Sequence, residues 1–488
     1  MTDIGLIYNE NLVYTEYPYN PDKIYPEIKY TFTAQPNNLI YAEMREILKK
    51  MDFDKENQNS EKWNPFGFFI KPGDNVLIKP NFVLENFKHP FSVITHPTVI
   101  RFLIDYSFIA TGYKGKIIVA DSPQMNANID NIFTITKIKN LVNFLKEKGI
   151  PIELFDLRAE NVEFKRIKRS KLKGDPSGYT IVDLKQESFL YELEKYQRPN
   201  FYGADFNRKI VNYNHNINRN AYAISNTLLN SDVVISIPKL KTHKKAGVTL
   251  NLKNFIGINV HKNYLPHYRI GCPKQKGDSF PNMNSFLNWS RFLVYLFRDI
   301  FLSNYNSKIG KIFFKILNLR SYFESLIIRL FFPRFYDHYY YMIDGDWNGN
   351  DTIWRTILDL NIIVKYADKS GIIKDTPQRQ IFSIIDGIIG GDKDGPLNPG
   401  EKNAGVIIIS KNHVLADLIA TKIMGFNFQK VPLLKNILFN KSFPILEDNL
   451  NKIKIISNNE ELNNITYEEL KLNLRFIPPT GWANIKNK

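Results

Sequence analysis

The stretch HPTVIRFLIDYSFIATGYKGKIIVADSP, residues 96–123, decides the fold class. Apolar residues recur in it at helical spacing from Val99 to Tyr106, which predicts a helix over 98–110. The β-branched run at 116–120 then predicts a buried strand. A helix followed within a few residues by a buried strand is typical of chains that build a parallel sheet.

The sequence on both sides continues this alternation. We expect a strand at 76–78 before the stretch, and a helix at 136–148 and a strand at 151–155 after it. This order is typical of parallel βαβ units. The later elements we expect are strands at 233–237, 381–385 and 405–410 and a helix at 413–425. The predicted fold is therefore α/β, a mostly parallel sheet with flanking helices.

Changes of pattern divide the chain into four parts. The α/β core is expected to comprise 66–284 and 335–430, preceded by an N-terminal lead-in at 1–65 and followed by a C-terminal extension at 431–488. Residues 285–334 interrupt the core with two amphipathic helical stretches, the second at 311–332. Within the core, residues 157–230 are polar, and we expect irregular structure there.

The inserted segment 285–334 is basic, with eight Lys and Arg against Asp299 and Glu324. One interpretation is a helical lid packed on the core. The alternative is an anchor on an anionic membrane surface, where each exposed cation adds about 1 kcal/mol to binding.

Composition limits the class of protein. The net charge of +16, from 65 basic and 49 acidic residues, favours anionic partners, although a solvated basic surface would explain it equally well. A single cysteine, Cys272, excludes an internal disulfide, a cysteine-ligated iron–sulfur cluster and a thiolate zinc site, and it suits a reducing compartment. No signal pattern and no long apolar run is found, so we expect a cytoplasmic protein, with attachment to a membrane surface as the alternative.

Polar motifs begin where four expected strands end. Lys79 and Asn81 follow the first strand, Asp121 follows the second, and Lys239 and Asp386 follow two later ones. In open α/β sheets, ligands bind beyond the carboxyl ends of the strands. Polar turns follow most strands in any protein, but four such motifs together favour a shared site.

The segment 239–276 contains eight Lys, Arg269 and three His, and it has no Asp or Glu. Cations so close together repel one another, so we expect an ordered loop here to take an anion from outside. A floppy, solvated basic loop is the alternative. The candidate binding residues in and just after its most basic part are Lys239, Lys241, Thr249, Lys253 and Asn254, with His243 as a proton carrier.

The glycine-rich segment 386–396 carries three carboxylates. Asp386 or Asp394 would serve as a general base or hold a hard cation, and a plain turn cluster is the alternative. We assign no metal ligands, although a divalent metal remains compatible, and the cofactor stays unassigned.

Near Asp344 an EF-hand-like start is rejected, because Arg355 stands where a bidentate Glu is needed. Instead we expect Asp351 to cap a helix at 352–365, and Arg355 to pair with Asp359. The sequence also lacks the phosphate-binding, dinucleotide, metalloprotease and serine-hydrolase motifs. A nucleic-acid partner is disfavoured because basic residues are not interleaved with aromatic ones in an RNA-binding pattern.

Several blocks together resemble the domain of unknown function 362 family. They are VLIKPNFV (76–83), HPTVIRFLIDYSF with GKIIVADSP (96–123), SDVVISIPKLKTHKKAGVTLNLKNFIGI (231–258), GNDTIWRTILDLN (349–361) and IIDGIIGGDKDGPLNPG (384–400) followed by NHVLADLIATKIMGF (412–426). The resemblance spans roughly 70–430 and places Asp417 where the family pattern has an Asp. It implies an α/β fold and no established activity. Some relatives carry ferredoxin-type cysteine clusters, which this chain lacks.

Two functions follow as hypotheses. The first is an enzyme that binds a phosphate- or carboxylate-bearing small molecule at the carboxyl edge of the sheet. The second is a non-catalytic accessory protein that binds anionic lipid or an envelope-glycan intermediate through 285–334.

Overall fold

The computed structural model describes residues 2–163, 168–195, 200–204, 208–283, 285–302, 342–438, 442–446 and 450–486, with isolated residues between 308 and 330. Its centre is a sheet in which ten described strands pair in the order β17-β1-β16-β15-β11-β2-β3-β4, with β12 and β13 attached beside β15. The strands are β1 (Thr2–Tyr8), β2 (Val76–Pro80), β3 (Ile117–Asp121), β4 (Ile152–Asp156), β11 (Val233–Ile237), β12 (Lys239–His243), β13 (Gly247–Thr249), β15 (Gln380–Asp392), β16 (Gly400–Ser410) and β17 (Ile453–Ser457).

The sheet is mostly parallel, which confirms the predicted α/β class. Strands β15, β11, β2, β3 and β4 all run in one direction, and β16 returns antiparallel between β15 and β1. The basic segment 239–276, predicted as a loop, begins with strand β12, which pairs with β13 and β15 and is buried along its whole length.

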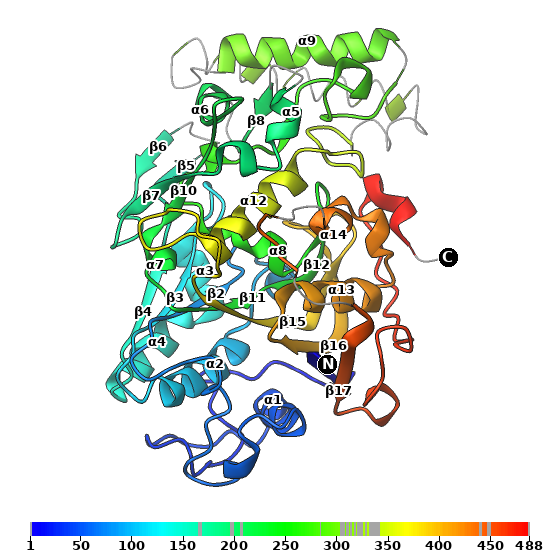
Figure 1. Ribbon diagram of the computed structural model, residues 1–488. Coiled ribbons are helices and arrows are strands. Elements are labelled where there is room, and N and C mark those ends of the chain that lie inside the picture. Colours follow the sequence, from blue (N-terminus) through cyan, green and yellow to red (C-terminus); the bar gives the residue numbers. More distant parts are fainter. Residues whose placement is uncertain are drawn as a thin grey trace.

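Helices cover both faces of the sheet because alternate strand residues point to opposite sides. Val76 and Ile78 belong to one apolar cluster and Leu77 to the other. The first cluster packs under α1 (Leu39–Lys50), α2 (Pro97–Ala110), α3 (Ile129–Thr136) and α4 (Ile138–Glu147), and the second under α8 (Asn251–Asn254), α12 (Ile353–Tyr366), α13 (His413–Ile423) and α14 (Pro432–Lys435). Figure 1 shows these two layers on either side of the strands.

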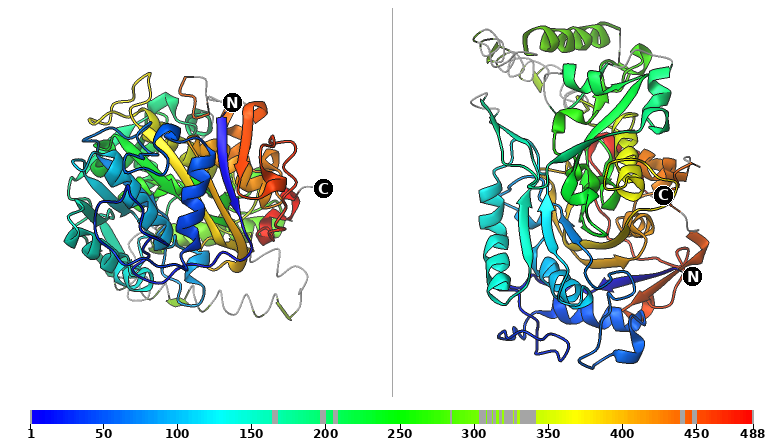
Figure 2. Two further views of the ribbon diagram at one scale, coloured as in Figure 1. Left: turned by 90° about the horizontal axis from the view of Figure 1, so that it is seen from below. Right: turned by 60° about the vertical axis from the view of Figure 1, so that its left-hand side comes forward.

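Both ends of the described chain contribute to the central sheet. Strand β1 lies between β16 and β17, pairing antiparallel with the first and parallel with the second. Figure 2 shows β1 and α1 side by side across the sheet. Residues from the lead-in at 1–65 and from the extension at 431–488 therefore complete one edge of the sheet.

The prediction of irregular structure at 157–230 is wrong. This region forms two antiparallel sheets, β7-β10-β9 and β5-β6, and β8 pairs with β14. Most residues of β5 and β7 are at least partly exposed, so these strands lack the continuous apolar run that marked the central strands. The elements are β5 (Glu160–Glu163), β6 (Lys168–Lys171), β7 (Tyr179–Asp183), α5 (Tyr191–Lys195), β8 (Phe201–Tyr202), α6 (Arg208–Asn214), β9 (His215–Asn216), β10 (Arg219–Ser225), α7 (Asn226–Leu229) and β14 (Tyr268–Arg269).

The first inserted helix is α9 (Ser285–Leu302), which Figures 1 and 2 show at the end of the molecule beyond α6 and β8. Tyr295 is buried on it against Tyr202 and Tyr268. Most of the second predicted stretch, 311–332, lies outside the described residues. Among the helices in the described part of the chain, none is long and apolar enough to cross a membrane.

Candidate functional site

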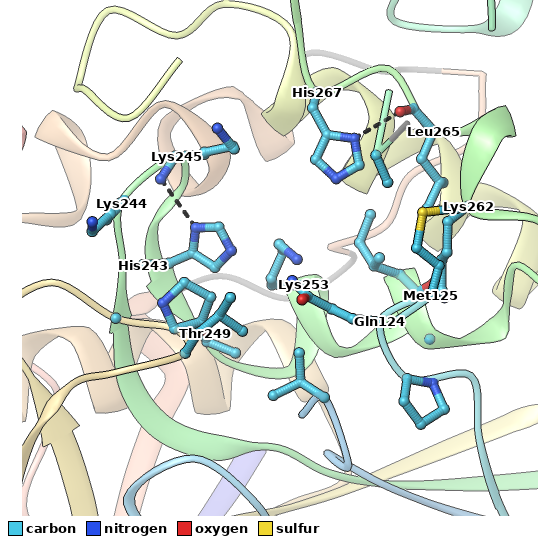
Figure 3. A pocket seen from close by; sticks show the side chains of 18 of the residues that line it. Gln124, Met125, His243, Lys244, Lys245, Thr249, Lys253, Lys262, Leu265 and His267 are labelled. Carbon is cyan, nitrogen blue, oxygen red and sulfur yellow. Dashed lines mark hydrogen bonds between the residues drawn. The ribbon is translucent and has the colours of Figure 1, made fainter. Parts of the chain in front are cut away.

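A cavity of about 560 Å³ lies at the carboxyl ends of β2 and β3, beside β12 and β13 and below α9. This volume is within the range of small-molecule sites. Nine of the residues selected from the sequence line it, and Figure 3 shows several of them pointing into the open space. They are Lys79, Asn81, Asp121, Lys241, His243, Thr249, Lys253, Asn254 and Asp394.

Lys239 and Asp386 are brought together, but away from the cavity lining. Lys239 Nζ lies 3.0 Å from Asp386 Oδ2, and both side chains are fully buried. Tyr14 Oη and the His96 backbone N–H donate to the same carboxylate at 2.5 and 2.9 Å. Asp386, predicted as a base or metal ligand, and Lys239, predicted as an anion ligand, therefore do not face this cavity. Their partners lie inside the protein.

The floor of the cavity is a buried ion pair between neighbouring strands. Lys79 Nζ lies 2.7 Å from Asp121 Oδ1, and Asn254 Oδ1 accepts a second hydrogen bond from the ammonium at 3.1 Å. The Phe82 backbone N–H donates to Asp121 Oδ2 at 2.7 Å. Gly257 makes this packing possible, because a Cβ there would stand 2.0 Å from Asp121 Oδ1.

Three further lysines face the cavity without a carboxylate partner among the described residues. Lys241 Nζ donates to Asn81 Oδ1 at 3.1 Å and to a backbone carbonyl. Lys262 Nζ donates only to backbone carbonyls, and no hydrogen bond of Lys253 Nζ is found in the described part of the chain. Burial, with the neighbouring positive charges, lowers the pKa of Lys253 to about 8 and that of Lys262 to about 7. The same causes lower the pKa of Lys241 well below its ordinary value.

The hydroxyl of Thr249 adds a polar group that is not satisfied within the described residues. Thr249 lines the cavity and is 3% exposed, and its Oγ1 has no hydrogen-bond partner there. Leaving such a group unpaired costs roughly 1–3 kcal/mol. A ligand that fills the cavity would recover this loss.

His243 is held as a hydrogen-bond donor toward the cavity. Its Nδ1 accepts the backbone N–H groups of Lys245 and Ala246 at 3.1 and 3.3 Å, so in the neutral ring the proton sits on Nε2. Burial and the nearby lysines lower the pKa of His243 well below its ordinary value. Protonating Nδ1 would break both contacts, so the structure does not support the predicted role of His243 as a proton carrier.

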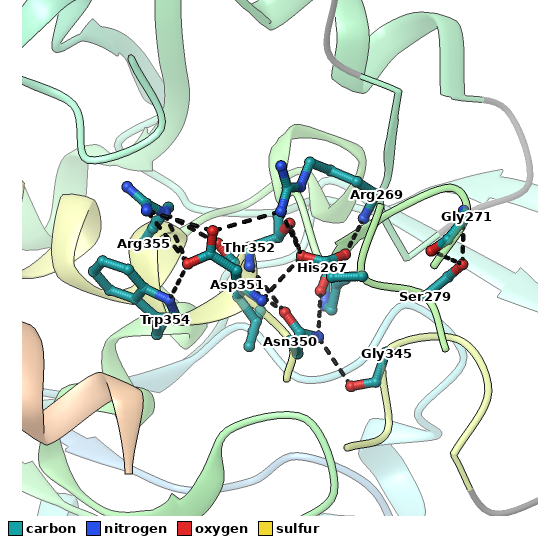
Figure 4. Close-up of polar contacts among 12 residues, drawn as sticks. His267, Arg269, Gly271, Ser279, Gly345, Asn350, Asp351, Thr352, Trp354 and Arg355 are labelled. Atoms are coloured by element: carbon teal, nitrogen blue, oxygen red, sulfur yellow. Dashed lines mark hydrogen bonds and ion pairs between the residues drawn. The ribbon is translucent and has the colours of Figure 1, made fainter. Parts of the chain in front are cut away.

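His267 belongs to the basic segment 239–276 but was not predicted as a site residue. It faces His243 across the cavity (Figure 3). Its Nδ1 lies 2.7 Å from the carbonyl oxygen of Leu265 and must donate to it, which leaves a lone pair on Nε2. Burial, followed by the charge of Lys245, lowers the pKa of His267 to about 3. Asn350 holds the backbone here, donating to the carbonyls of His267 and Gly345 at 3.0 and 2.9 Å (Figure 4).

The far wall consists of ion pairs from distant parts of the chain. Lys245 Nζ lies 2.8 Å from Asp346, and Arg298 of α9 lies 2.8 Å from Asp344. The carboxylates that the basic segment lacks are thus partly supplied from 344–346. The expectation of an external anion therefore applies to Lys241, Lys253 and Lys262, and no longer to every cation of the segment.

Asp394 reaches the cavity from the turn after β15. Thr480 fixes it, donating from its backbone N–H and its hydroxyl at 3.0 and 3.1 Å. Among the described residues, no group of three or more His, Cys, Asp or Glu side chains is placed to hold a metal ion.

Residues 184–422 match the family model described as Domain of unknown function (DUF362). The chain is a member of the DUF362 family. The matched region contains β12, β13 and α8 and so supplies the lysines without carboxylate partners, while Lys79, Asn81 and Asp121 precede it. Comparison with curated proteins and with solved structures finds no significant match.

Asp417 lies within the DUF362 region, on α13 and outside the cavity. Its role is structural. Its carboxylate accepts the backbone N–H groups of Asn251 and Leu252 at 2.8 and 2.9 Å, and also the Asn251 side chain. Asp417 thereby fixes the start of α8, the short helix that carries Lys253 and Asn254. Burial raises the pKa of Asp417 to about 7.

Two expectations near α12 are wrong. Asn350 Oδ1, and not Asp351, accepts the N–H groups of the first residues of the helix (Figure 4). Arg355 pairs with Asp351, 3.3 Å away, instead of Asp359, whose carboxylate bonds Ser188 and Tyr222. Spacing alone predicted both contacts, and tertiary partners replaced them.

Proposed function

We propose that this protein is a cytoplasmic enzyme whose cavity binds a phosphate- or carboxylate-bearing small molecule. The observation that carries the proposal is the set of three buried lysine amino groups, on Lys241, Lys253 and Lys262, that face the cavity without a carboxylate partner among the described residues.

The chemistry of the cavity supports an anionic ligand over a neutral one. Buried cations are unfavourable unless paired, and a bound anion would offset this cost for all three lysines. His243 Nε2–H and the unsatisfied Thr249 hydroxyl add neutral donors at the same cavity. The Lys79–Asp121 pair in the floor is already neutral and would position the ligand without contributing net charge.

Inorganic phosphate is the probe that tests this proposal. Isothermal titration should detect phosphate binding to the wild-type protein, and Lys253→Met should weaken it about 10- to 150-fold. This range corresponds to one charge-assisted hydrogen bond of about 1.5–3 kcal/mol.

The matched control is Lys139→Met on the exposed surface of α4. It removes the same charge from the molecule and should leave the dissociation constant unchanged. Absence of phosphate, sulfate and citrate binding in the wild-type protein, or equal weakening by both variants, would contradict the proposal.

A second candidate function, peripheral binding to an anionic membrane, is favoured by the surface of the inserted segment. Trp289 and Leu296, seven residues apart on α9, are 59% and 36% exposed. The described apolar residues that follow are exposed as well, namely Ile312, Ile316, Leu319, Leu326 and Leu330. Exposed apolar residues in a basic segment fit the interface of an anionic bilayer.

Co-sedimentation with phosphatidylglycerol vesicles and with phosphatidylcholine vesicles at low salt tests this candidate. Selective binding to the anionic vesicles, reduced in Trp289→Ser/Leu296→Ser, is expected if it is correct. A protein that stays in the supernatant with both lipids has no such function.

A further inference from the structure

His243 and His267 have opposite hydrogen-bonding roles at the same cavity. His243 Nδ1 is occupied as an acceptor by two backbone N–H groups, and His267 Nδ1 is occupied as a donor by the Leu265 carbonyl. The Nε2 atom of His243 therefore offers a proton, and that of His267 offers a lone pair. In the described part of the chain, neither Nε2 has a hydrogen-bond partner, and Figure 3 shows the two rings on opposite sides of Lys253.

We propose that the two histidines are a fixed donor–acceptor pair that selects an anionic ligand carrying a hydroxyl group. His243 Nε2–H would donate to the anionic end of the ligand, and His267 Nε2 would accept the ligand's hydroxyl proton. This inference deepens the proposed function and rests on it.

The charges around the cavity define which group can meet His267. An anionic oxygen would repel the lone pair on Nε2, so the ligand must present an O–H or N–H there. A cationic ammonium would be repelled by Lys245, Lys253 and Lys262, all of which lower the pKa of this ring. A neutral hydroxyl satisfies both conditions. The ligand class is therefore a hydroxylated phosphate ester or a hydroxy acid.

The local structure resists exchange of the two tautomers. If the proton of His243 moved onto Nδ1, it would point at the backbone N–H groups of Lys245 and Ala246, which could then no longer donate to this nitrogen. If the proton of His267 moved to Nε2, the lone pair of Nδ1 would face a lone pair of the Leu265 carbonyl oxygen at 2.7 Å. The His243 change forfeits two buried hydrogen bonds and the His267 change one, and each lost bond costs roughly 1–3 kcal/mol.

Diethylpyrocarbonate modification at pH 7 tests the pair on the wild-type protein, because this reagent attacks an imidazole nitrogen that carries a free lone pair. Peptide mass spectrometry should find His267 modified and His243 protected. His89, whose side chain is 33% exposed, provides the reactive reference. His215, with both ring nitrogens bonded, provides the protected one. Modification of His243 at the rate of His267 would overturn the proposal.

Adding inorganic phosphate separates this inference from the proposed function. Phosphate should slow modification of His267 and leave His89 unchanged. If His267 reacts selectively but phosphate neither protects it nor binds in the titration, the histidine roles stand and the anion site fails.

Ligand selectivity completes the test. Glycerol 3-phosphate should bind about tenfold more tightly than propyl phosphate, which has the same chain length without hydroxyls, because one more hydrogen bond forms. The preference should disappear in His267→Phe and persist in Lys253→Met, where both ligands weaken together. Equal binding of the two esters to the wild-type protein, or a preference that survives in His267→Phe, would refute hydroxyl selection.

Discussion

At the residue scale, the floor of the cavity depends on the missing side chain of Gly257. A Cβ there would stand 2.0 Å from Asp121 Oδ1 and 2.6 Å from Lys79 Nζ, so the ion pair would have to move. The residue has no unusual positive φ that would require glycine. Close approach of the backbone to the Lys79–Asp121 pair is thus the reason for glycine at this position.

We expect Gly257→Ala to reduce the free energy of unfolding by about 1–3 kcal/mol, the usual cost of overpacking a buried site. Urea unfolding measures this change, and phosphate affinity should fall with it because the cavity floor shifts. The comparison variant is Gly149→Ala, whose φ is +84° with no atom within 4 Å of the new Cβ. Backbone strain alone should leave phosphate binding intact, and loss of binding in both variants would argue against the steric explanation.

At the element scale, α8 is too short to be stable on its own and is positioned by contacts with other segments. Asp417 bonds its first backbone N–H groups, and Asn361 of α12 donates to the Leu252 carbonyl at 3.0 Å. The positions of Lys253 and Asn254 therefore depend on residues more than 100 positions later in the chain.

Asp417→Asn should weaken phosphate binding as well as lower stability. An amide NH₂ would face a backbone N–H that now meets a carboxylate oxygen, which costs about 1–3 kcal/mol. Asp359→Asn is the matched control, because burial raises the pKa of both carboxyls to about 7 and Asp359 does not line the cavity. We expect both variants to unfold at lower urea concentration, and only Asp417→Asn to lose phosphate affinity. Unchanged affinity in Asp417→Asn would remove its positioning role.

At the scale of the whole molecule, the folded chain gathers cations that are far apart in the sequence around one cavity. Lys79 comes from β2, Lys253 from α8 and Arg298 from α9. Their mutual repulsion and burial depress the pKa of the lysines without carboxylate partners, so the charge of the site varies near neutral pH.

Anion affinity should therefore fall as the pH rises. The pKa of Lys253, lowered by burial to about 8, means that its ammonium is present at pH 7 and largely lost at pH 9. Sulfate is the suitable probe, because it remains a dianion over this range. Its affinity should drop by up to about tenfold per pH unit above 8, and the drop should be smaller in Lys253→Met. A flat or rising affinity between pH 7 and pH 9 would contradict this assignment.

Local pattern was a good guide to the parallel strands of the core and to helices α2, α12 and α13, and a poor one to the remaining strands. The strands of the parallel core are buried on both faces, so their apolar runs were recognisable in the sequence. The partly exposed strands β5 and β7 gave no such signal, and neither did β1 and its neighbour β17 at the edge of the sheet. Among the site residues, Lys262 and His267 lie in the carboxylate-free segment 239–276, but nothing in their spacing distinguished them from surface residues.

The sequence by itself determined the α/β class and brought polar residues to the carboxyl edge of a parallel sheet, because strand direction follows from the order of elements along the chain. Only the tertiary structure decided which charges are paired. Asp386 comes to Lys239, Asp346 to Lys245 and Asp344 to Arg298, whereas Lys241, Lys253 and Lys262 receive no carboxylate among the described residues. The physical reason is that an ion pair depends on distance and burial in space, and local spacing along the chain does not specify either.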